Sequence, residues 1–343
     1  MVGLTQGNIL KADAEALVNT VNCVGHMGKG IALQFKKAFP DNYVYYKKAC
    51  DLKKVRIGKI LVYETGTFVN PRYIINFPTK NHWRGKSKYE YIESGLVALL
   101  REVEHLNIKS IAIPPLGTGL GGLEWKRVRF MIKEAFSNLS DVDTILYEPI
   151  GAPSAADMPI GTKKPKMTVA RALLLKLMQQ YSHHFYRHTL LEIQKLAYFL
   201  QESGEKLRLN FVKHHYGPYA HNLNKVLEIL EGHYIEGYGD TQKPDVEIEL
   251  LEGAIENADN FLDTHPEPRS RLNRVAELVD GFETPYGMEL LSSVHWLITR
   301  EGVSKDRRDV IREIQKWSDR KANSFQESHI EIALERLKTA KWI

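Results

Sequence analysis

The chain has 343 residues, 43% of them hydrophobic and 26% charged, and this length predicts two domains rather than a single core. No apolar run approaches the roughly 18 residues that cross a bilayer, and the first residues lack the pattern of a secretion signal, so we expect a cytoplasmic protein with no membrane contact. The two cysteines, Cys23 and Cys50, fit neither a disulfide framework nor a zinc site, which favours a reducing compartment and argues against redox chemistry.

Short apolar runs alternate with helical runs over the first 150 residues. Periodicity predicts a helix over 89–106, and four strands are predicted at 60–64, 73–77, 110–113 and 144–147. Such alternation is typical of an α/β fold, here a mixed sheet with helices on both faces. Residues 1–160 also carry 21 Lys and Arg against 15 Asp and Glu, so this part of the chain is the one suited to a polyanion.

Two glycine-rich loops each lie between a predicted strand and a helix. The first is within 18–35, where two asparagines and three glycines occur, and the second spans 114–122. Glycine lets the backbone approach a ligand closely, and the N–H groups at a helix start attract anionic oxygen. Neither loop matches the Walker A or dinucleotide-binding patterns. Two such loops predict a clamp around a pyrophosphate; the alternative is a pair of tight turns with no ligand.

The stretch 153–165 is rich in Pro, Gly and small residues and shows no period. It predicts a linker between a first domain of residues 1–152 and a second domain of residues 166–343. Beyond the linker the pattern is helical, and helices are predicted over 167–181, 188–201, 221–232, 252–264, 270–281, 285–300, 306–317 and 328–339. We therefore expect a mainly α second domain, and a candidate strand pair at 209–212 and 246–249 leaves α+β open.

The motifs of the first domain, in this order, resemble the macrodomain family, the ADP-ribose-binding α/β module. The resemblance rests on residues 7–10, on residues 16–22 with the glycine loop that follows, and on residues 114–125. The form Asn-Thr-Val-Asn-Cys-Val-Gly-x-Met-Gly-Lys-Gly and the strand end at 76–80 are similar to the branch that holds terminal ADP-ribose glycohydrolase and the DarG antitoxins. With a second domain of this size behind the macrodomain, the chain resembles the DarG branch specifically. This resemblance implies removal of ADP-ribose from thymidine bases in DNA.

The resemblance and the loop chemistry together predict an ADP-ribose site that needs no metal and no cofactor. The phosphates are expected to meet backbone N–H groups of the helix start and of the second loop. The Asn22 amide offers both a donor and an acceptor to the distal ribose, with Thr79 beside it. The expected ADP-ribose-binding residues are Asn8, Ile9, Thr20, Val21, Asn22, Gly28, Gly30, Ile31, Ala32, Leu33, Gln34, Thr79, Gly117, Thr118, Gly119, Leu120 and Gly121.

Lys80 is the candidate catalytic residue. A lysine at a strand end is often a solvated charge, but the strands of one sheet present their carboxyl ends to a shared crevice. In the glycohydrolases that this sequence resembles, the matching lysine attacks the anomeric carbon of the distal ribose. That role requires a neutral amine, so the pKa of Lys80 must be lowered by burial or by a nearby cation such as Lys29, Arg84 or Lys86.

The second loop departs from the pattern of this branch. The human glycohydrolase carries an aspartate where this chain has Gly121, and the resemblance implies that this aspartate helps release from carboxylate-linked sites on proteins. Its absence puts a protein-linked substrate in doubt, and a glycine is expected to open room for a base. The bond cut would then be the N-glycosidic bond to thymine, which needs a proton donor. His26 and His82 flank the loops, but structural roles fit them as well.

Residues 80–89 mix cations with aromatic side chains beside the expected catalytic strand end. Cations neutralise phosphates and aromatic faces stack unpaired bases, so the mixture suits single-stranded nucleic acid, although a solvated loop would have the same composition. This stretch therefore supports ADP-ribosylated single-stranded DNA as a partner.

The second domain shows no catalytic constellation. Its residues 190–200 and 214–219 resemble an antitoxin domain family with a similar Lys-Leu-x-Tyr-Phe helix and Tyr-Gly-Pro turn. The resemblance implies a toxin partner, and in a DarG-like protein this is a DarT-like DNA ADP-ribosyltransferase. We therefore expect an antitoxin that both hydrolyses ADP-ribose from thymidine in DNA and binds its toxin. The alternatives are a non-catalytic ADP-ribose reader with an adaptor domain and a glycohydrolase that acts on proteins.

Overall fold

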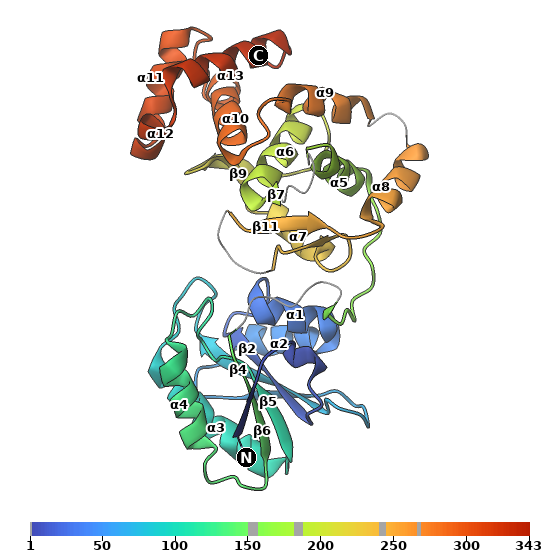
Figure 1. Ribbon diagram of the computed structural model, residues 1–343, viewed down its shortest axis with the longest axis vertical. Helices are drawn as coiled ribbons and strands as arrows, with labels where there is room; N and C mark the ends of the chain where they lie inside the picture. Colours follow the sequence, from blue (N-terminus) through green and yellow to red (C-terminus); the bar gives the residue numbers. More distant parts are fainter. Residues whose placement is uncertain (1, 150–156, 182–187, 240–244, 266–268) are drawn as a thin grey trace. The chain divides into compact units, whose positions relative to one another are not determined.

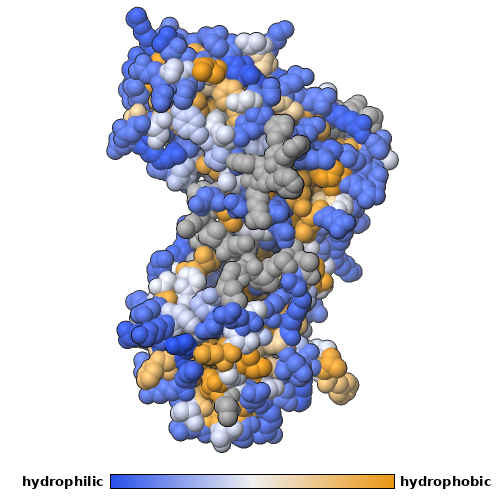
Figure 2. Space-filling model, in the orientation of Figure 1, coloured by the Kyte–Doolittle hydropathy of each residue, from blue (hydrophilic) through white to orange (hydrophobic). Residues whose placement is uncertain are grey.

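The computed structural model describes residues 2–149, 157–181, 188–239, 245–265 and 269–343 (Figure 1). The chain divides into two compact units: unit 1 is formed by Met1–Lys163 with Gly239–Gln242, and unit 2 by Lys164–Tyr238 with Lys243–Ile343. The part of the predicted linker at 153–156 lies outside the described residues. Within the described ranges, no helix combines the length and the apolar character needed to cross a membrane. The face drawn in Figure 2 is mostly hydrophilic, with hydrophobic residues in separate groups.

Unit 1 is built on one mixed sheet of six strands in the order β1-β6-β5-β2-β4-β3. The strands are β1 (Val2–Thr5), β2 (Ala16–Asn22), β3 (Leu61–Glu64), β4 (Tyr73–Lys80), β5 (Ser110–Ile113) and β6 (Asp143–Tyr147). Strand β3 runs antiparallel to β4, and the other neighbours are parallel. The predicted mixed sheet is confirmed, and β4 extends beyond the predicted run to include Lys80.

Helices cover both faces of this sheet, as predicted (Figure 1). They are α1 (Gly30–Ala38), α2 (Pro40–Asp51), α3 (Tyr89–His105) and α4 (Trp125–Ala135), and a short 3-10 helix η1 (Ile9–Lys11) follows β1. Because successive side chains of a strand point to opposite faces, Val18 packs toward α3 and α4 while Leu17 packs toward α1.

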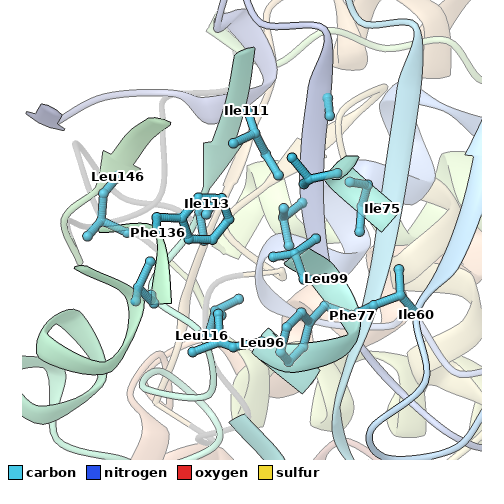
Figure 3. Packing of buried hydrophobic residues seen from close by; sticks show 14 of the residues in the cluster. Ile60, Ile75, Phe77, Leu96, Leu99, Ile111, Ile113, Leu116, Phe136 and Leu146 are labelled. Carbon is cyan, nitrogen blue, oxygen red and sulfur yellow. The ribbon is translucent and has the colours of Figure 1, made fainter. Parts of the chain in front are cut away.

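The main core of unit 1 lies between the sheet and helices α3 and α4. Figure 3 shows side chains of the two layers pointing toward one another, with Leu96 and Leu99 of α3 against Phe77 of β4. The helix comes close to the sheet because Gly95 carries no side chain: a Cβ there would lie 2.2 Å from the Phe77 ring. This packing holds β4, and therefore its last residue, in a fixed position.

Unit 2 is mainly helical with two small sheets, which confirms the predicted class. Its helices are α5 (Val169–Tyr181), α6 (Leu190–Glu202), α7 (Leu223–Leu230), α8 (Ala254–Asp263), α9 (Arg269–Val279), α10 (Pro285–Arg300), α11 (Arg307–Trp317), α12 (Asp319–Ser324) and α13 (Glu327–Thr339). Its strands are β7 (His188–Thr189), β8 (Phe211–His214), β9 (Gly217–Ala220), β10 (Ile235–Glu236) and β11 (Glu247–Leu250).

The prediction that residues 209–212 pair with residues 246–249 in unit 2 is wrong. Strand β8 pairs with β9 in a hairpin, whereas β11 pairs with β10 and β7. The hairpin closes over a two-residue turn, and Gly217 at its exit has φ +86°, a left-handed conformation that glycine adopts easily. A local hairpin costs little loop-closure entropy, so the nearer partner is favoured over the distant one.

Candidate active site

The site lies at the carboxyl ends of β2 and β4, two neighbouring parallel strands of unit 1. Asn22 at the end of β2 is the register partner of Lys80 at the end of β4, next to a shift in register after Val21. The Cys23 N–H continues the pairing with a 3.2 Å hydrogen bond to the Asn81 carbonyl. Strand β5, on the other side of β2, leads into the second glycine loop. Both predicted loops and Lys80 therefore share one edge of the sheet.

Asn22 shapes the first glycine loop. Its amide Nδ2 donates to the His26 carbonyl at 2.5 Å, and its Oδ1 accepts from the N–H groups of Val24 at 3.0 Å and His26 at 3.3 Å. The buried Tyr46 hydroxyl of α2 donates to the Asn22 carbonyl at 2.7 Å. The Asn22 amide is thus used to fold the loop, and its predicted contact with the distal ribose stays a prediction. Sequence reasoning missed Tyr46, because nothing local links α2 to this loop.

Further along this loop the chain enters α1. Gly30 begins the helix with φ +56°, and the first-turn residues Ile31 and Ala32 have N–H groups that lack intrahelical acceptors by the geometry of a helix start. The N-cap residue is Lys29, whose ammonium group has no acceptor to offer them. The predicted residues Leu33 and Gln34 complete the turn, with Leu33 buried. This geometry suits an anion at the start of α1.

The second loop folds on itself through backbone hydrogen bonds. The Gly122 N–H donates to the Gly119 carbonyl at 3.0 Å, and the Leu123 N–H donates to the Gly117 carbonyl at 3.1 Å. Gly117 has φ +69°, and the Thr118 hydroxyl donates to the Pro115 carbonyl at 3.1 Å. The loop is therefore held in one shape without any ligand contact.

Gly119 and Gly121 have opposite surroundings. A Cβ on Gly119 would meet nothing within 4 Å, whereas a Cβ on Gly121 would lie 2.1 Å from the Gly117 carbonyl oxygen and 2.4 Å from the Ser87 hydroxyl. The expectation that Gly121 opens room for a base is therefore not supported, because the missing side chain would point into the loop itself. Gly121 is required for loop closure, and the open side of the loop is at Gly119.

The two loops meet near Leu120. A Cβ on Gly30 would lie 3.8 Å from the Leu120 side chain, so the start of α1 faces the second loop. The Lys80 ammonium donates a 2.6 Å hydrogen bond to the Leu120 carbonyl. The structure thus brings together the strand-end lysine and both glycine loops.

Lys80 is half-buried, and this burial lowers its pKa below the ordinary value of a lysine, with a further lowering by the Lys86 cation. The predicted direction of the shift is confirmed, and Lys86 is the one of the three candidate cations that contributes to it. A larger fraction of Lys80 is therefore present as the neutral amine that nucleophilic attack requires.

The remaining predicted residues lie along the same edge of the sheet. Asn8 and Ile9 follow the carboxyl end of β1, where the Asn8 Oδ1 caps η1 by accepting from the Leu10 N–H at 3.0 Å, and Ile9 is buried. Thr20 and Val21 lie within β2, and the buried Thr79 hydroxyl lies 3.4 Å from the Val21 carbonyl, to which it donates. Thr79 therefore ties β4 to β2 in this structure.

An aromatic and cationic cluster follows Lys80 directly. The Trp83 ring lies 5.2 Å from the His26 ring and 5.4 Å from the His82 ring, measured between centroids, and the Arg84 guanidinium lies 4.5 Å from the Trp83 centroid. Cation–π and stacking contacts of this kind hold the segment against the first glycine loop. The predicted mixture of cations and aromatic rings is therefore an ordered cluster next to the site.

Unit 2 brings together the two motifs that carried the antitoxin resemblance. The buried Lys195 of α6 donates to the Pro218 carbonyl at 2.6 Å, and the Gln194 amide exchanges hydrogen bonds with the backbone of Ala220 at 2.9 and 3.2 Å. The helix thus binds the turn directly. Across the described parts of both units, no three His, Cys, Asp or Glu side chains are grouped as ligands of a metal would be.

The sheet order, with glycine loops after β2 and β5, defines a macrodomain, and the family model named Macro domain matches residues 18–132. A curated relative, the DNA ADP-ribosyl glycohydrolase of Thermus aquaticus, is 48% identical over 337 residues, covering 98% of this chain and 93% of the relative. The chain therefore belongs to the DNA ADP-ribosyl glycohydrolase family, the DarG family that its motifs resemble.

Two further similarities each cover less than half of this chain. The solved macrodomain of Mycobacterium tuberculosis DarG is 53% identical, with a TM-score of 0.43, and the match covers 44% of this chain and 99% of that one. A DNA ADP-ribosyl transferase-DNA ADP-ribosyl glycohydrolase fusion protein of Thermosipho africanus is 33% identical over 164 residues, which are 43% of this chain and 42% of the fusion protein.

Proposed function

We propose that unit 1 removes ADP-ribose from thymidine bases of single-stranded DNA, with Lys80 as the nucleophile. The observation that carries this proposal is the position of Lys80, half-buried at a strand end and hydrogen-bonded to one of two glycine loops that face each other. Membership of the DNA ADP-ribosyl glycohydrolase family supports the substrate class.

In the proposed mechanism the backbone holds the pyrophosphate and Lys80 carries the chemistry. The N–H groups of Ile31 and Ala32 at the start of α1 bind the phosphates from one side, whereas the Gly30 N–H donates to the Gly239 carbonyl at 2.6 Å. The second loop binds the phosphates near Gly119. The bond between the thymine nitrogen and C1 of the distal ribose breaks, and its electron pair leaves with thymine. The neutral Lys80 amine attacks C1 and forms a covalent adduct, which water hydrolyses to release ADP-ribose and restore the lysine. The lowered pKa of Lys80 favours this step.

Two features support DNA as the carrier of the thymidine. The Trp83 and Arg84 pair beside the catalytic lysine offers a base-stacking surface and a cation for phosphate. The excess of Lys and Arg in residues 1–160 adds an attractive field for a polyanion. The free cysteines Cys23 and Cys50 fit the reducing cytoplasm that we infer as the location.

The substrate proposal is tested with the purified full-length chain. Release of ADP-ribose is followed from a thymidine-modified single-stranded oligonucleotide and from a protein modified on glutamate, each with and without a chelator. We expect rapid release from the DNA that the chelator does not change, and slow release from the protein. Faster release from the protein would favour the protein-directed alternative, and binding without release from either would favour an ADP-ribose reader.

We further propose that unit 2 binds and inhibits a DarT-like DNA ADP-ribosyltransferase, so that the whole chain acts as an antitoxin. The contact between Lys195 and the Pro218 turn supports the resemblance to an antitoxin domain, since both motifs belong to one folded site. The Thermosipho africanus relative joins a transferase and a glycohydrolase in one protein, which supports a transferase as the partner.

This second proposal is tested with the full-length Lys80→Ala variant, in which hydrolysis is expected to be absent. The variant is mixed with the transferase, and transfer of ADP-ribose to single-stranded DNA is measured after co-purification of the two proteins. We expect a stable complex and strongly reduced transfer. A complex with undiminished transferase activity, or no complex, would leave unit 1 as a repair enzyme with a second domain of another role.

A further inference from the structure

When the bond between the thymine nitrogen and C1 of the distal ribose breaks, that nitrogen needs a proton. The segments that form the site, 18–35, 76–89 and 114–125, contain a single carboxylate, Glu124, which is exposed at the N-cap of α4. Two other acidic groups are too weak to act near neutral pH. Burial raises the pKa of the Cys23 thiol to about 11, and burial likewise raises the pKa of Tyr46 far above its ordinary value. Imidazole is the side chain used most often for proton transfer in catalysis, and these segments contain two, His26 and His82.

Three contacts hold His26 in place. Its backbone N–H and carbonyl are both bonded to the Asn22 side chain, at 3.3 and 2.5 Å. Its ring packs on Trp83 with 5.2 Å between centroids. Asn22 is in turn the register partner of Lys80, so the backbone of His26 is separated from the catalytic strand end by one side chain. These contacts fix the position of His26 within the first glycine loop, and fixed placement is what a general acid needs to stay within reach of the atom that it protonates.

The orientation of the His26 ring is given by Gly28. A Cβ on Gly28 would lie 2.4 Å from the His26 Nε2 atom, so this nitrogen occupies the space that a side chain would fill in the first glycine loop. The Nε2 edge is therefore directed over the backbone of the ADP-ribose loop.

His82 has a different position. It is exposed, and its Nδ1 atom accepts from the Arg84 N–H at 3.2 Å within its own turn. Its ring stacks on Trp83 at 5.4 Å, and no hydrogen bond of the described residues joins its side chain to either glycine loop. Of the two imidazoles, His26 is the one built into the ligand loop.

We propose that His26 is the proton donor of the reaction, with Trp83 as the residue that positions its ring. This inference rests on the proposed function. As the bond between thymine and C1 breaks, the Nε2–H of the imidazolium transfers its proton to the departing thymine, whose electron pair accepts it. Neutral thymidine remains in the DNA, and water later returns a proton to the imidazole when it hydrolyses the Lys80 adduct. Protons and electrons therefore balance over one turnover.

Other charged and titratable groups surround this loop. Lys47 and Cys50 of α2 lie against Gly25, Arg84 lies on the Trp83 ring, and Lys80 with Lys86 lies on the β4 side. A general acid produces loss of activity at high pH, whereas a lysine nucleophile produces loss at low pH. The two limbs can therefore be assigned separately.

The test compares two substrates in full-length His26→Gln. One is thymidine-linked ADP-ribose in single-stranded DNA, and the other is ADP-ribose joined at C1 to p-nitrophenol, which leaves without protonation. We expect kcat on the thymidine substrate to fall by about 100-fold or more, with loss of the high-pH limb, and kcat on the p-nitrophenyl substrate to change by less than about threefold. Exposed His105, in the last turn of α3, gives the matched control His105→Gln, for which both rates should be unchanged.

Other outcomes would overturn the inference. Equal losses on both substrates would assign His26 to loop structure, and a loss seen in His82→Gln instead would assign the proton to His82. Trp83→Ala frees the ring without altering the Asn22 bonds, and it should lower kcat on the thymidine substrate and weaken the high-pH limb. A rise in KM with unchanged kcat would instead assign Trp83 to DNA binding alone. ADP-ribose affinity, measured by calorimetry, confirms that each variant is folded. A wild-type chain that does not turn over the thymidine substrate would refute the proposed function and this inference with it.

Discussion

The Gly119→Glu variant tests directly whether the second glycine loop binds the pyrophosphate. Gly119 is exposed, has no left-handed φ, and would meet no atom within 4 Å if it carried a Cβ, so the loop can accept a side chain there without strain. A glutamate would place its carboxylate beside the expected phosphates. A carboxylate about 5 Å from one pyrophosphate charge, at an effective dielectric constant of about 20, costs about 3 kcal/mol. The Kd for ADP-ribose should therefore rise by roughly two orders of magnitude.

Calorimetry of ADP-ribose binding measures this effect, and Gly119→Gln separates charge from size. The neutral variant should lose much less affinity than the charged one, and higher salt should reduce the difference between them because screening weakens the repulsion. A folded Gly119→Glu protein with unchanged ADP-ribose affinity would refute the assignment of the second loop to the phosphates.

Three further predictions concern the site and the stability of each unit. Lys86→Gln removes a cation that lowers the pKa of Lys80, so the low-pH limb of the kcat profile should move to higher pH; an unmoved limb would contradict the pairing of the two lysines. Gly121→Ala forces a Cβ against a backbone oxygen at 2.1 Å and should lower the free energy of unfolding of unit 1 by about 1–3 kcal/mol in denaturant titrations, whereas Gly119→Ala should be nearly neutral; equal effects would contradict the loop geometry. Burial lowers the pKa of Lys195 to about 7, so the unfolded chain binds more protons than the folded one between about pH 7 and 10 and the stability of unit 2 should rise with pH across this window, by up to about 5 kcal/mol from this residue. Lys195→Met should remove that part of the rise in urea titrations at successive pH values, and an unaltered slope would contradict it.

Much of unit 1 is predictable from its sequence because its signals are local. Apolar runs of strand length alternate with periodic helices, and this pattern is enough for a mixed sheet covered on both faces. Lys80 is predictable as a candidate site residue because it lies at the carboxyl end of a strand, and ligands of parallel sheets bind outside the carboxyl ends of the strands. The glycine loops are predictable for the same reason, since each follows a strand.

The contacts that complete the site are not local, and the sequence does not indicate them. Tyr46 reaches Asn22 from a different helix, and the ring of His26 is ordered by Trp83, 57 residues further along the chain. The direction of the missing side chain at Gly121 also depends on how the loop closes on Gly117. The predicted partner of β8 is wrong because the partner of a strand depends on the whole topology. The Tyr-Gly-Pro sequence does indicate the hairpin turn that joins β8 to its actual partner β9.

We propose Lys80 as the nucleophile of a DNA ADP-ribosyl glycohydrolase. The most direct measurement is the single-turnover rate of ADP-ribose release from a thymidine-modified single-stranded oligonucleotide by Lys80→Ala and by Lys80→Arg, with ADP-ribose affinity measured in parallel. Both variants should bind ADP-ribose, and release should be undetectable, because alanine has no nucleophile and arginine keeps its charge. Release at the wild-type rate by a folded Lys80→Ala protein would exclude Lys80 as the nucleophile.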